Sequence, residues 1–108
     1  MTHHFAVWAP DYTDPDCLKR RLAVRPNHAT NIKTLIENGI LKVAGFTITP
    51  DSLELDNSER KMNGSMLVVA AANMAEVRTI IESDPYWDGK VWDKEKLTIM
   101  PFVAVTPL

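Results

Sequence analysis

Two residues of this chain, His28 and Asp84, have side chains suited to acid–base chemistry. A free imidazole gains and loses its proton near neutral pH, so a positioned histidine can act as a general base or acid. Asp84 directly precedes Pro85, which restricts the backbone, and a carboxylate fixed there could orient a histidine or share its proton. The alternatives are structural: a half-buried histidine without a role, and an aspartate that shapes a turn. A catalytic pair is therefore one of two hypotheses for these residues.

A second group of residues could bind a ligand beside that pair. Arg25 could hold an anion through its planar guanidinium group, or it could pair with a nearby acid. Ser65 follows Gly64, so its hydroxyl could reach a cavity where the glycine leaves room, or it could complete a turn. Aromatic side chains could wall a pocket for a ring-shaped ligand, or they could form a core edge or a subunit contact. These aromatic residues are Trp8, Phe46, Tyr86, Trp87 and Trp92.

The sequence lacks the usual patterns of metal and cofactor sites. No set of His, Cys, Asp and Glu has the spacing of a zinc site, and the adjacent His3 and His4 would point to opposite faces of a strand. The four glycines do not form a phosphate-binding loop. We therefore expect neither a metal nor an organic cofactor.

The amino-acid composition limits the kinds of partner that this protein could bind. Twelve Lys+Arg against fourteen Asp+Glu give a net charge of -2, which argues against nucleic-acid binding. The longest apolar run, Met66 to Ala72, is far shorter than the ~20 residues of a membrane-spanning helix. The first residues show no secretory pattern, and a single cysteine, Cys17, fits a reducing compartment. We expect a soluble cytoplasmic protein whose partner is a small molecule.

Four short apolar segments predict strands. The uninterrupted run from Met66 to Ala72 predicts a central strand that is covered on both faces. Gly45 suggests a bend or a close backbone approach, and Pro101 favours a sheet edge or a bulge because it lacks a backbone N–H. The predicted strands are Phe5 to Trp8, Leu41 to Thr49, Gly64 to Ala72 and Leu97 to Val105.

Two helical regions lie between these strands. The first opens at Asp14-Pro15, a pattern typical of a helix N-terminus. Pro26 predicts a break or kink, followed by a helix over Asn27 to Asn38. The second region begins after Asn73, which has capping-box spacing, and ends near Ser83. An aromatic, charged loop is expected after it.

The resulting order, βαββαβ, is that of the α+β ferredoxin-like fold. This fold has a four-stranded antiparallel sheet in which the first and third strands are central and both helices cover one face. A length of 108 residues fits a single domain, 1-108. Because the helices leave one face of the sheet bare, we expect a second subunit to cover it in a homodimer.

The arrangement of several residues resembles the YCII-related family from about Phe5 to Phe102. The matching features are Arg25-Pro26-x-His28, Gly39 and Gly45, Gly64-Ser65 before an apolar strand, Glu76, and Asp84-Pro85-Tyr86. The sequence departs from the family at Phe46, where proline commonly follows the glycine. The resemblance implies a ferredoxin-like domain that pairs sheet against sheet in a dimeric α+β barrel. It further implies a catalytic pair at His28 and Asp84, with Ser65 and Arg25 near the same pocket.

The residues and the resemblance together predict a small, cofactor-independent homodimeric enzyme. Its acid–base chemistry would be of the lyase, isomerase, dehydratase or dehydrochlorinase type, on a small cyclic or aromatic metabolite. Two alternatives remain open. One is a non-catalytic protein that binds a metabolite in the same pocket. The other is a cofactor-free oxygenase whose substrate site is lined by the tryptophans.

Overall fold

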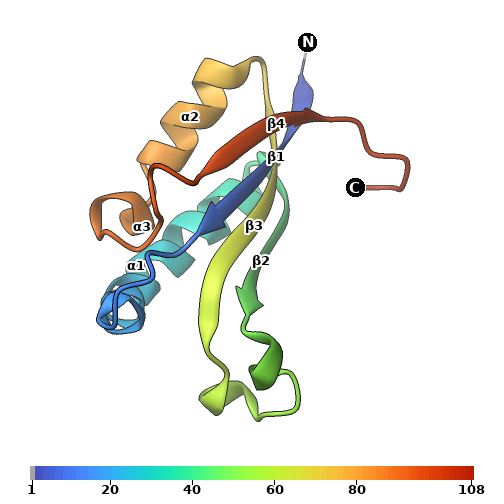
Figure 1. Ribbon diagram of the computed structural model, residues 1–108. Coiled ribbons are helices and arrows are strands. Elements are labelled where there is room, and N and C mark those ends of the chain that lie inside the picture. Colours follow the sequence, from blue (N-terminus) through green and yellow to red (C-terminus); the bar gives the residue numbers. More distant parts are fainter. Residues whose placement is uncertain (1) are drawn as a thin grey trace.

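The computed structural model describes residues 2–108 and contains four strands and three α-helices (Figure 1). Two single-turn 3-10 helices, Pro50–Ser52 and Asn57–Glu59, lie in the exposed connection between the second and third strands. The elements in chain order are β1 (His3–Pro10), α1 (Cys17–Glu37), β2 (Leu41–Ile48), β3 (Met62–Ala71), α2 (Met74–Glu82), α3 (Pro85–Asp88) and β4 (Thr98–Phe102).

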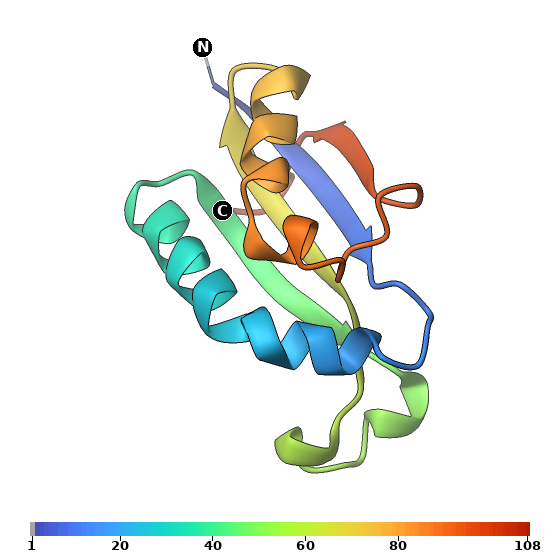
Figure 2. The ribbon, with the colours of Figure 1, turned by 90° about the vertical axis from the view of Figure 1, so that its left-hand side faces the viewer.

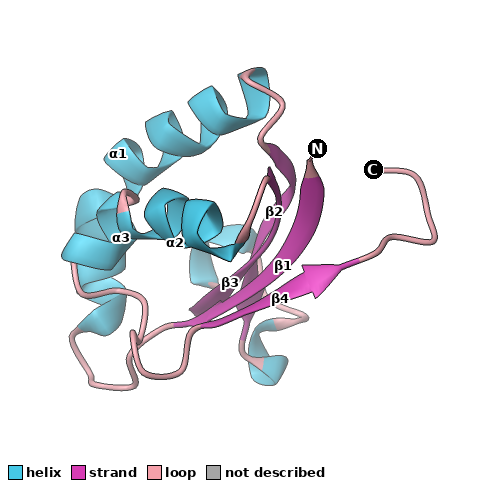
Figure 3. Cartoon of the chain, turned by 90° about the horizontal axis from the view of Figure 1, so that it is seen from above, coloured by secondary structure: helices cyan, strands magenta, loops and turns pink. Residues whose placement is uncertain are grey.

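The four strands form one antiparallel sheet in the order β2-β3-β1-β4. The first and third strands are therefore the central pair, as predicted. All three helices lie on one side of the sheet (Figure 3). Seen from that side, α3 lies between α2 and α1 (Figure 2), and it packs against α1. The predicted ferredoxin-like α+β fold is confirmed.

Strand alternation separates a core face from an open face, by which we mean the sheet face opposite the helices. Phe5 and Val7 of β1 are buried beneath the helices and pair with Val69 and Leu67 of β3. Met66 of β3 points the other way and is 50% exposed. The prediction that this strand is covered on both faces is therefore wrong for the single chain, because no helix reaches the open face.

Of the break or kink predicted at Pro26, the break is wrong, because α1 runs through this residue from Cys17 to Glu37. The ribbon of α1 does change direction along its length (Figure 2). Proline cannot donate to the carbonyl of Leu22 one turn earlier, and this loss usually destabilises a helix interior. Both residues are exposed, so water can take the place of the missing donor. The uninterrupted helix keeps Arg21, Arg25 and His28 in register, four and three residues apart, on one face.

Unlike the break at Pro26, the predicted ends of the helices agree with the structure. The Asn73 side chain accepts a hydrogen bond from the backbone N–H of Glu76 at 2.9 Å, which confirms this N-cap of α2. Ser83 ends the same helix. Gly39 follows α1 with a φ of 72°, the left-handed conformation that favours glycine. The segment predicted as an aromatic loop begins instead with the short helix α3.

The two strand glycines have different surroundings. A Cβ at Gly45 would meet no atom within 4 Å, so the close approach expected there is absent. A Cβ at Gly64 would lie 2.6 Å from Cη2 of Trp8, and this is where the absence of a side chain is required. Pro101 lies in β4, which is an edge strand as predicted. None of the helices in residues 2–108 has the length and apolarity to cross a membrane.

Candidate functional site

His28 and Asp84 are in direct contact although 56 residues separate them in the sequence. The His28 Nδ1 atom lies 2.7 Å from Oδ1 and 2.9 Å from Oδ2 of the carboxylate. The His28 side chain is 16% exposed and the Asp84 side chain 3%. Helix α1 supplies the histidine, and Asp84 is the N-cap of α3. The fold therefore joins two residues that the sequence could only suggest as a pair.

Asp84 accepts further hydrogen bonds that bear on the tautomer of His28. The backbone N–H of Tyr86 donates to Oδ1 at 2.8 Å, and the side-chain amide of Asn31 donates to Oδ2 at 3.0 Å. A carboxylate can only accept, so with Asp84 in this form all of these groups donate to it, and Nδ1 of His28 carries the hydrogen between the two side chains. In the neutral ring the Nε2 atom is then an acceptor. Within residues 2–108, His28 makes no hydrogen bond through Nε2.

Two aromatic rings fix the plane of the imidazole. The Tyr86 ring stacks on His28 with 3.7 Å between centroids and 8° between planes. Trp92 meets both rings edge-on, 6.0 Å from His28 and 5.6 Å from Tyr86. Burial raises the pKa of the Tyr86 phenol, although Arg21 and Arg25 act in the opposite direction. Tyr86 therefore remains neutral at physiological pH and serves as a packing surface for the histidine.

A buried polar network lies beside this stack. The guanidinium of Arg21, which is 2% exposed, donates from Nη1 to Oδ1 of Asp11 at 2.6 Å. Its Nη2 donates to the hydroxyl of Ser65 at 3.2 Å and approaches the carbonyl of Gly64 at 3.4 Å. The indole N–H of Trp92 donates to the same hydroxyl at 3.1 Å. Burial raises the pKa of Asp11, and its pairing with Arg21 opposes this shift.

The open side of His28 faces a hollow of about 510 Å³ between α1 and the sheet, which we call the His28 hollow. Its volume is within the range of small-molecule sites. At the edge of the His28 hollow, the guanidinium of Arg25 lies 5.6 Å from the centroid of the Phe46 ring. The residues that line it are Arg21, Arg25, His28, Ala29, Ile32, Lys33, Ile36, Glu37, Ala44, Gly45, Phe46, Met62, Ser65, Leu67 and Tyr86.

Three of the predicted site residues do not line this hollow. Trp8 points to the open face of the sheet, because its neighbours on β1 point to the helices, and the prediction that it walls the pocket is wrong. Trp87 follows Tyr86 on α3, so its ring points in another direction and lies under the Lys94 ammonium group at 4.8 Å. Trp92 is fully buried behind the hollow and acts through its contacts with Ser65 and the two stacked rings.

Sequence reasoning missed Arg21, Asn31 and Asp11. The spacing of Arg21, Arg25 and His28 is that of one helix face and could have identified the first of them. Because a break was predicted at Pro26, Arg21 and His28 were assigned to different helices and this spacing was not considered. Asn31 lies three residues after His28 on the same helix, and Asp11 at the end of β1 had no distinguishing pattern.

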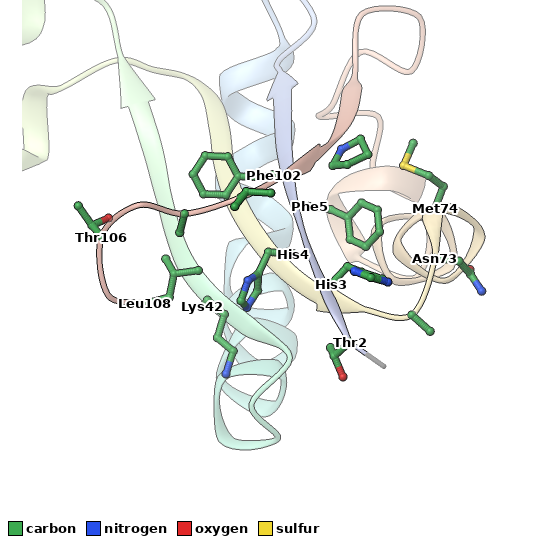
Figure 4. Close-up of a pocket in the computed structure, with 14 residues that line it drawn as sticks. Thr2, His3, His4, Phe5, Lys42, Asn73, Met74, Phe102, Thr106 and Leu108 are labelled. Carbon is green, nitrogen blue, oxygen red and sulfur yellow. The ribbon is translucent and has the colours of Figure 1, made fainter.

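A larger hollow, about 840 Å³, lies where β1 begins and β4 ends (Figure 4). His3, His4 and Lys42 border it, and the C-terminal tail turns back so that Leu108 borders it too. Neither histidine forms an ion pair with a carboxylate in the described part of the chain. The same part of the chain holds no group of His, Cys, Asp and Glu that could bind a metal. The His28 hollow is therefore the better candidate for acid–base chemistry.

A solved enzyme structure shares this fold. The chain matches 5-chloro-2-hydroxyhydroquinone dehydrochlorinase from Burkholderia phenoliruptrix AC1100, solved in complex with 2,5-dihydroxybenzoquinone, with a TM-score of 0.76. The match covers 93% of each chain at 21% sequence identity. At this identity the likeness establishes the fold alone.

Sequence comparisons identify relatives of this chain and the family to which it belongs. The chain is 30% identical over 98 residues to fusaric acid biosynthesis protein 2 of Gibberella fujikuroi, covering 91% of this chain and 90% of that protein. It is 30% identical over 90 residues to aspercryptin biosynthesis cluster protein B of Emericella nidulans, covering 83% of this chain but only 57% of the relative. The model of the YCII-related domain matches residues 5–102. The chain thus belongs to the YCII-related family.

Proposed function

We propose that this chain is a cofactor-independent acid–base enzyme in which His28 and Asp84 move protons on a small cyclic or aromatic metabolite. The observation that carries the proposal is the hydrogen-bonded pair itself, with His28 lining a hollow of about 510 Å³. Buried acid–base pairs in clefts are concentrated at catalytic sites. The reaction would be of the lyase or isomerase type, including dehydration and dehydrochlorination.

The geometry suggests how the proton moves. Nε2 of His28 takes a proton from a carbon or hydroxyl of the ligand, and the ring becomes an imidazolium. Asp84 stabilises this cation through the bond to Nδ1 and keeps the ring in the required tautomer. Arg25 at the edge of the hollow offsets negative charge that develops on a ligand oxygen. His28 then returns the proton to a different atom, or to a leaving group, to complete the cycle.

The names of similar proteins agree with this reaction class. The structural neighbour is a dehydrochlorinase of a chlorinated hydroxyhydroquinone, and its crystal contains a dihydroxybenzoquinone. The fungal relatives carry the names of biosynthetic proteins. An oxygenated ring would fit the combination of apolar walls and cationic edge in the His28 hollow.

Hydrogen–deuterium exchange tests the role of His28. Exchange is followed by NMR in deuterated buffer for a panel of phenols, enones and lactones. Wild type should accelerate exchange of at least one compound, and His28→Ala should lower that rate by about 10²- to 10⁴-fold. His3→Ala is the matched control, because this histidine is exposed and lies outside the hollow. Equal rates for wild type and His28→Ala would refute the proposal.

The second candidate function is ligand binding without catalysis, and the apolar lining of the hollow favours it. Ile32, Ile36, Phe46 and Leu67 provide surface for a ring but no chemistry. Binding that weakens less than about threefold in His28→Ala, roughly 0.65 kcal/mol, together with absent exchange, would favour this function. The oxygenase hypothesis is less well supported, because the tryptophans expected to line its substrate site are not among the residues that line the hollow.

We propose further that residues 1–108 form a single domain that works as a cytoplasmic homodimer. The open face exposes several large apolar side chains that the helices do not cover, which a second sheet could bury. The buried thiol of Cys17 fits a reducing compartment. The exposed apolar residues of this face are Val43, Met66, Met100 and Phe102.

A further inference from the structure

The hydroxyl of Ser65 has an unusual set of hydrogen-bond partners. It accepts one hydrogen bond from Nη2 of Arg21 at 3.2 Å and a second from the indole N–H of Trp92 at 3.1 Å. A guanidinium and an indole N–H can only donate. A serine hydroxyl has two lone pairs and one hydrogen, so these two partners occupy its whole accepting capacity.

The hydrogen of this hydroxyl has no acceptor in the described part of the chain. Ser65 is 2% exposed, and the surface that it retains borders the His28 hollow. Because Ser65 lines the hollow, this hydrogen is available to an acceptor atom of a ligand bound there. Ser65 presents a donor there, and Nε2 of His28 presents an acceptor.

The partners of Ser65 are themselves held in place. The Arg21 guanidinium is bound to the buried carboxylate of Asp11 at 2.6 Å, so it cannot turn away from the serine without leaving that charge unpaired. Trp92 is fully buried and packed edge-on against His28 and Tyr86. The polarity of the serine is therefore a fixed property of the hollow.

We propose that Arg21 and Trp92 act as positioning residues that hold Ser65 as a hydrogen-bond donor, so the hollow selects cyclic ligands with an acceptor oxygen. A ketone, quinone or phenolate oxygen accepts the hydrogen of the serine, whereas an ammonium group in its place has no lone pair and cannot accept it. The inference rests on the proposed function in taking the His28 hollow as the ligand site. A ring carbonyl next to an acidic carbon fits both groups, because Ser65 stabilises the oxygen as His28 removes the proton.

Two probes of nearly the same shape test this selection. Acetophenone has a carbonyl oxygen where α-methylstyrene has a methylene group, so only acetophenone can accept a hydrogen bond. We define the selectivity as the Kd of α-methylstyrene divided by that of acetophenone, both measured by NMR titration. Ser65→Ala should lower this ratio by about fivefold, the effect of one hydrogen bond. Ser52→Ala is the matched control, because that serine is fully buried outside the hollow and should leave the ratio unchanged.

A second variant tests the positioning. Trp92→Phe retains a ring but removes the indole N–H, which frees a lone pair of Ser65 and lets its hydrogen turn. The selectivity should fall by about twofold or more, with both probes still bound. A purely structural role of Trp92 would weaken both probes equally and leave the ratio unchanged. This comparison does not depend on Arg21, whose replacement could unfold the chain.

Three results would overturn the inference: the same selectivity in wild type and Ser65→Ala, an unchanged selectivity in Trp92→Phe, or no binding of either probe at millimolar concentration. The selectivity involves no proton transfer by His28. Exchange catalysis without selectivity would refute this inference alone, and selectivity without exchange would refute only the catalytic proposal.

Discussion

The negative charge of Asp84 should accelerate proton transfer by His28, and Asp84→Asn isolates that charge. Asparagine has the same shape, so its carbonyl oxygen can still accept the hydrogen bonds from the Tyr86 N–H and from His28 Nδ1. The amide group then faces Asn31, whose own amide can turn to accept a hydrogen bond. The tautomer of His28 and the cap of α3 should therefore survive while the carboxylate charge is lost.

The structure gives a lower and an upper limit for the loss of exchange rate in Asp84→Asn. Nδ1 of His28 lies 2.7 Å from the Asp84 carboxylate, and both side chains are largely buried. A hydrogen bond between charged groups exceeds a neutral one by about 1.5 kcal/mol, which corresponds to about tenfold in rate. The Coulomb attraction of two charges 4 Å apart at an effective dielectric constant of 20 is about 4 kcal/mol, or about a thousandfold. The exchange rate of Asp84→Asn should therefore be about ten to a thousand times lower than that of wild type.

The assay is the same deuterium exchange, with Asp88→Asn as control because this exposed aspartate lies on the same short helix. Nitrogen-15 NMR of the histidines should find the Nδ1–H tautomer of His28 in both wild type and Asp84→Asn. Full activity in Asp84→Asn would refute the role of the charge. A changed tautomer with a loss equal to that of His28→Ala would instead make orientation the main role of Asp84.

Four further substitutions test stability and assembly. Gly64→Ala should destabilise the protein by about 1–3 kcal/mol in urea unfolding, since the new Cβ would lie 2.6 Å from a tryptophan ring. Gly45→Ala should be neutral or stabilising, because a Cβ there meets nothing within 4 Å. Arg21→Met should cost about 3–5 kcal/mol at neutral pH, since it leaves the buried carboxylate of Asp11 unpaired. Burial raises the pKa of Asp11, so the folded state favours its protonated form and this loss should shrink as pH falls. Met66→Glu should convert a dimer of twice 12.2 kDa to a monomer in size-exclusion chromatography, and a wild-type monomer would refute sheet-to-sheet pairing.

The fold was predictable from local chemistry because each element has its own pattern. The apolar run that begins at Met66 identified the central strand, and the cap at Asn73 located the start of α2. The failure at Pro26 has a physical cause: the cost of proline in a helix depends on whether water can reach the carbonyl that loses its donor. The sequence does not contain this exposure, which is a property of the folded chain.

The candidate site was predictable in residue type but only partly in geometry. His28 and Asp84 were identified from their chemistry, and their contact depends on the packing of α3 against α1. Which aromatic residues line the hollow depends on the direction of each side chain. Strand alternation directs Trp8 of β1 away from the hollow, and the turn of α3 directs Tyr86 and Trp87 differently. Arg21 was missed because a buried charge becomes apparent only with its partner, and Asp11 comes from another element.

Strand alternation also separates the candidate site from the proposed dimer surface. On β3, Ser65 and Leu67 face the His28 hollow, while Met66 between them faces away and is 50% exposed. The hollow lies between α1 and the sheet, on the side opposite the proposed dimer surface, so pairing through the open face would not cover it. The second copy would instead stabilise the sheet on which Ser65 is held. Monomeric Met66→Glu should therefore retain exchange activity at temperatures where it remains folded, and loss of activity in a folded monomer would mean that the partner shapes the hollow.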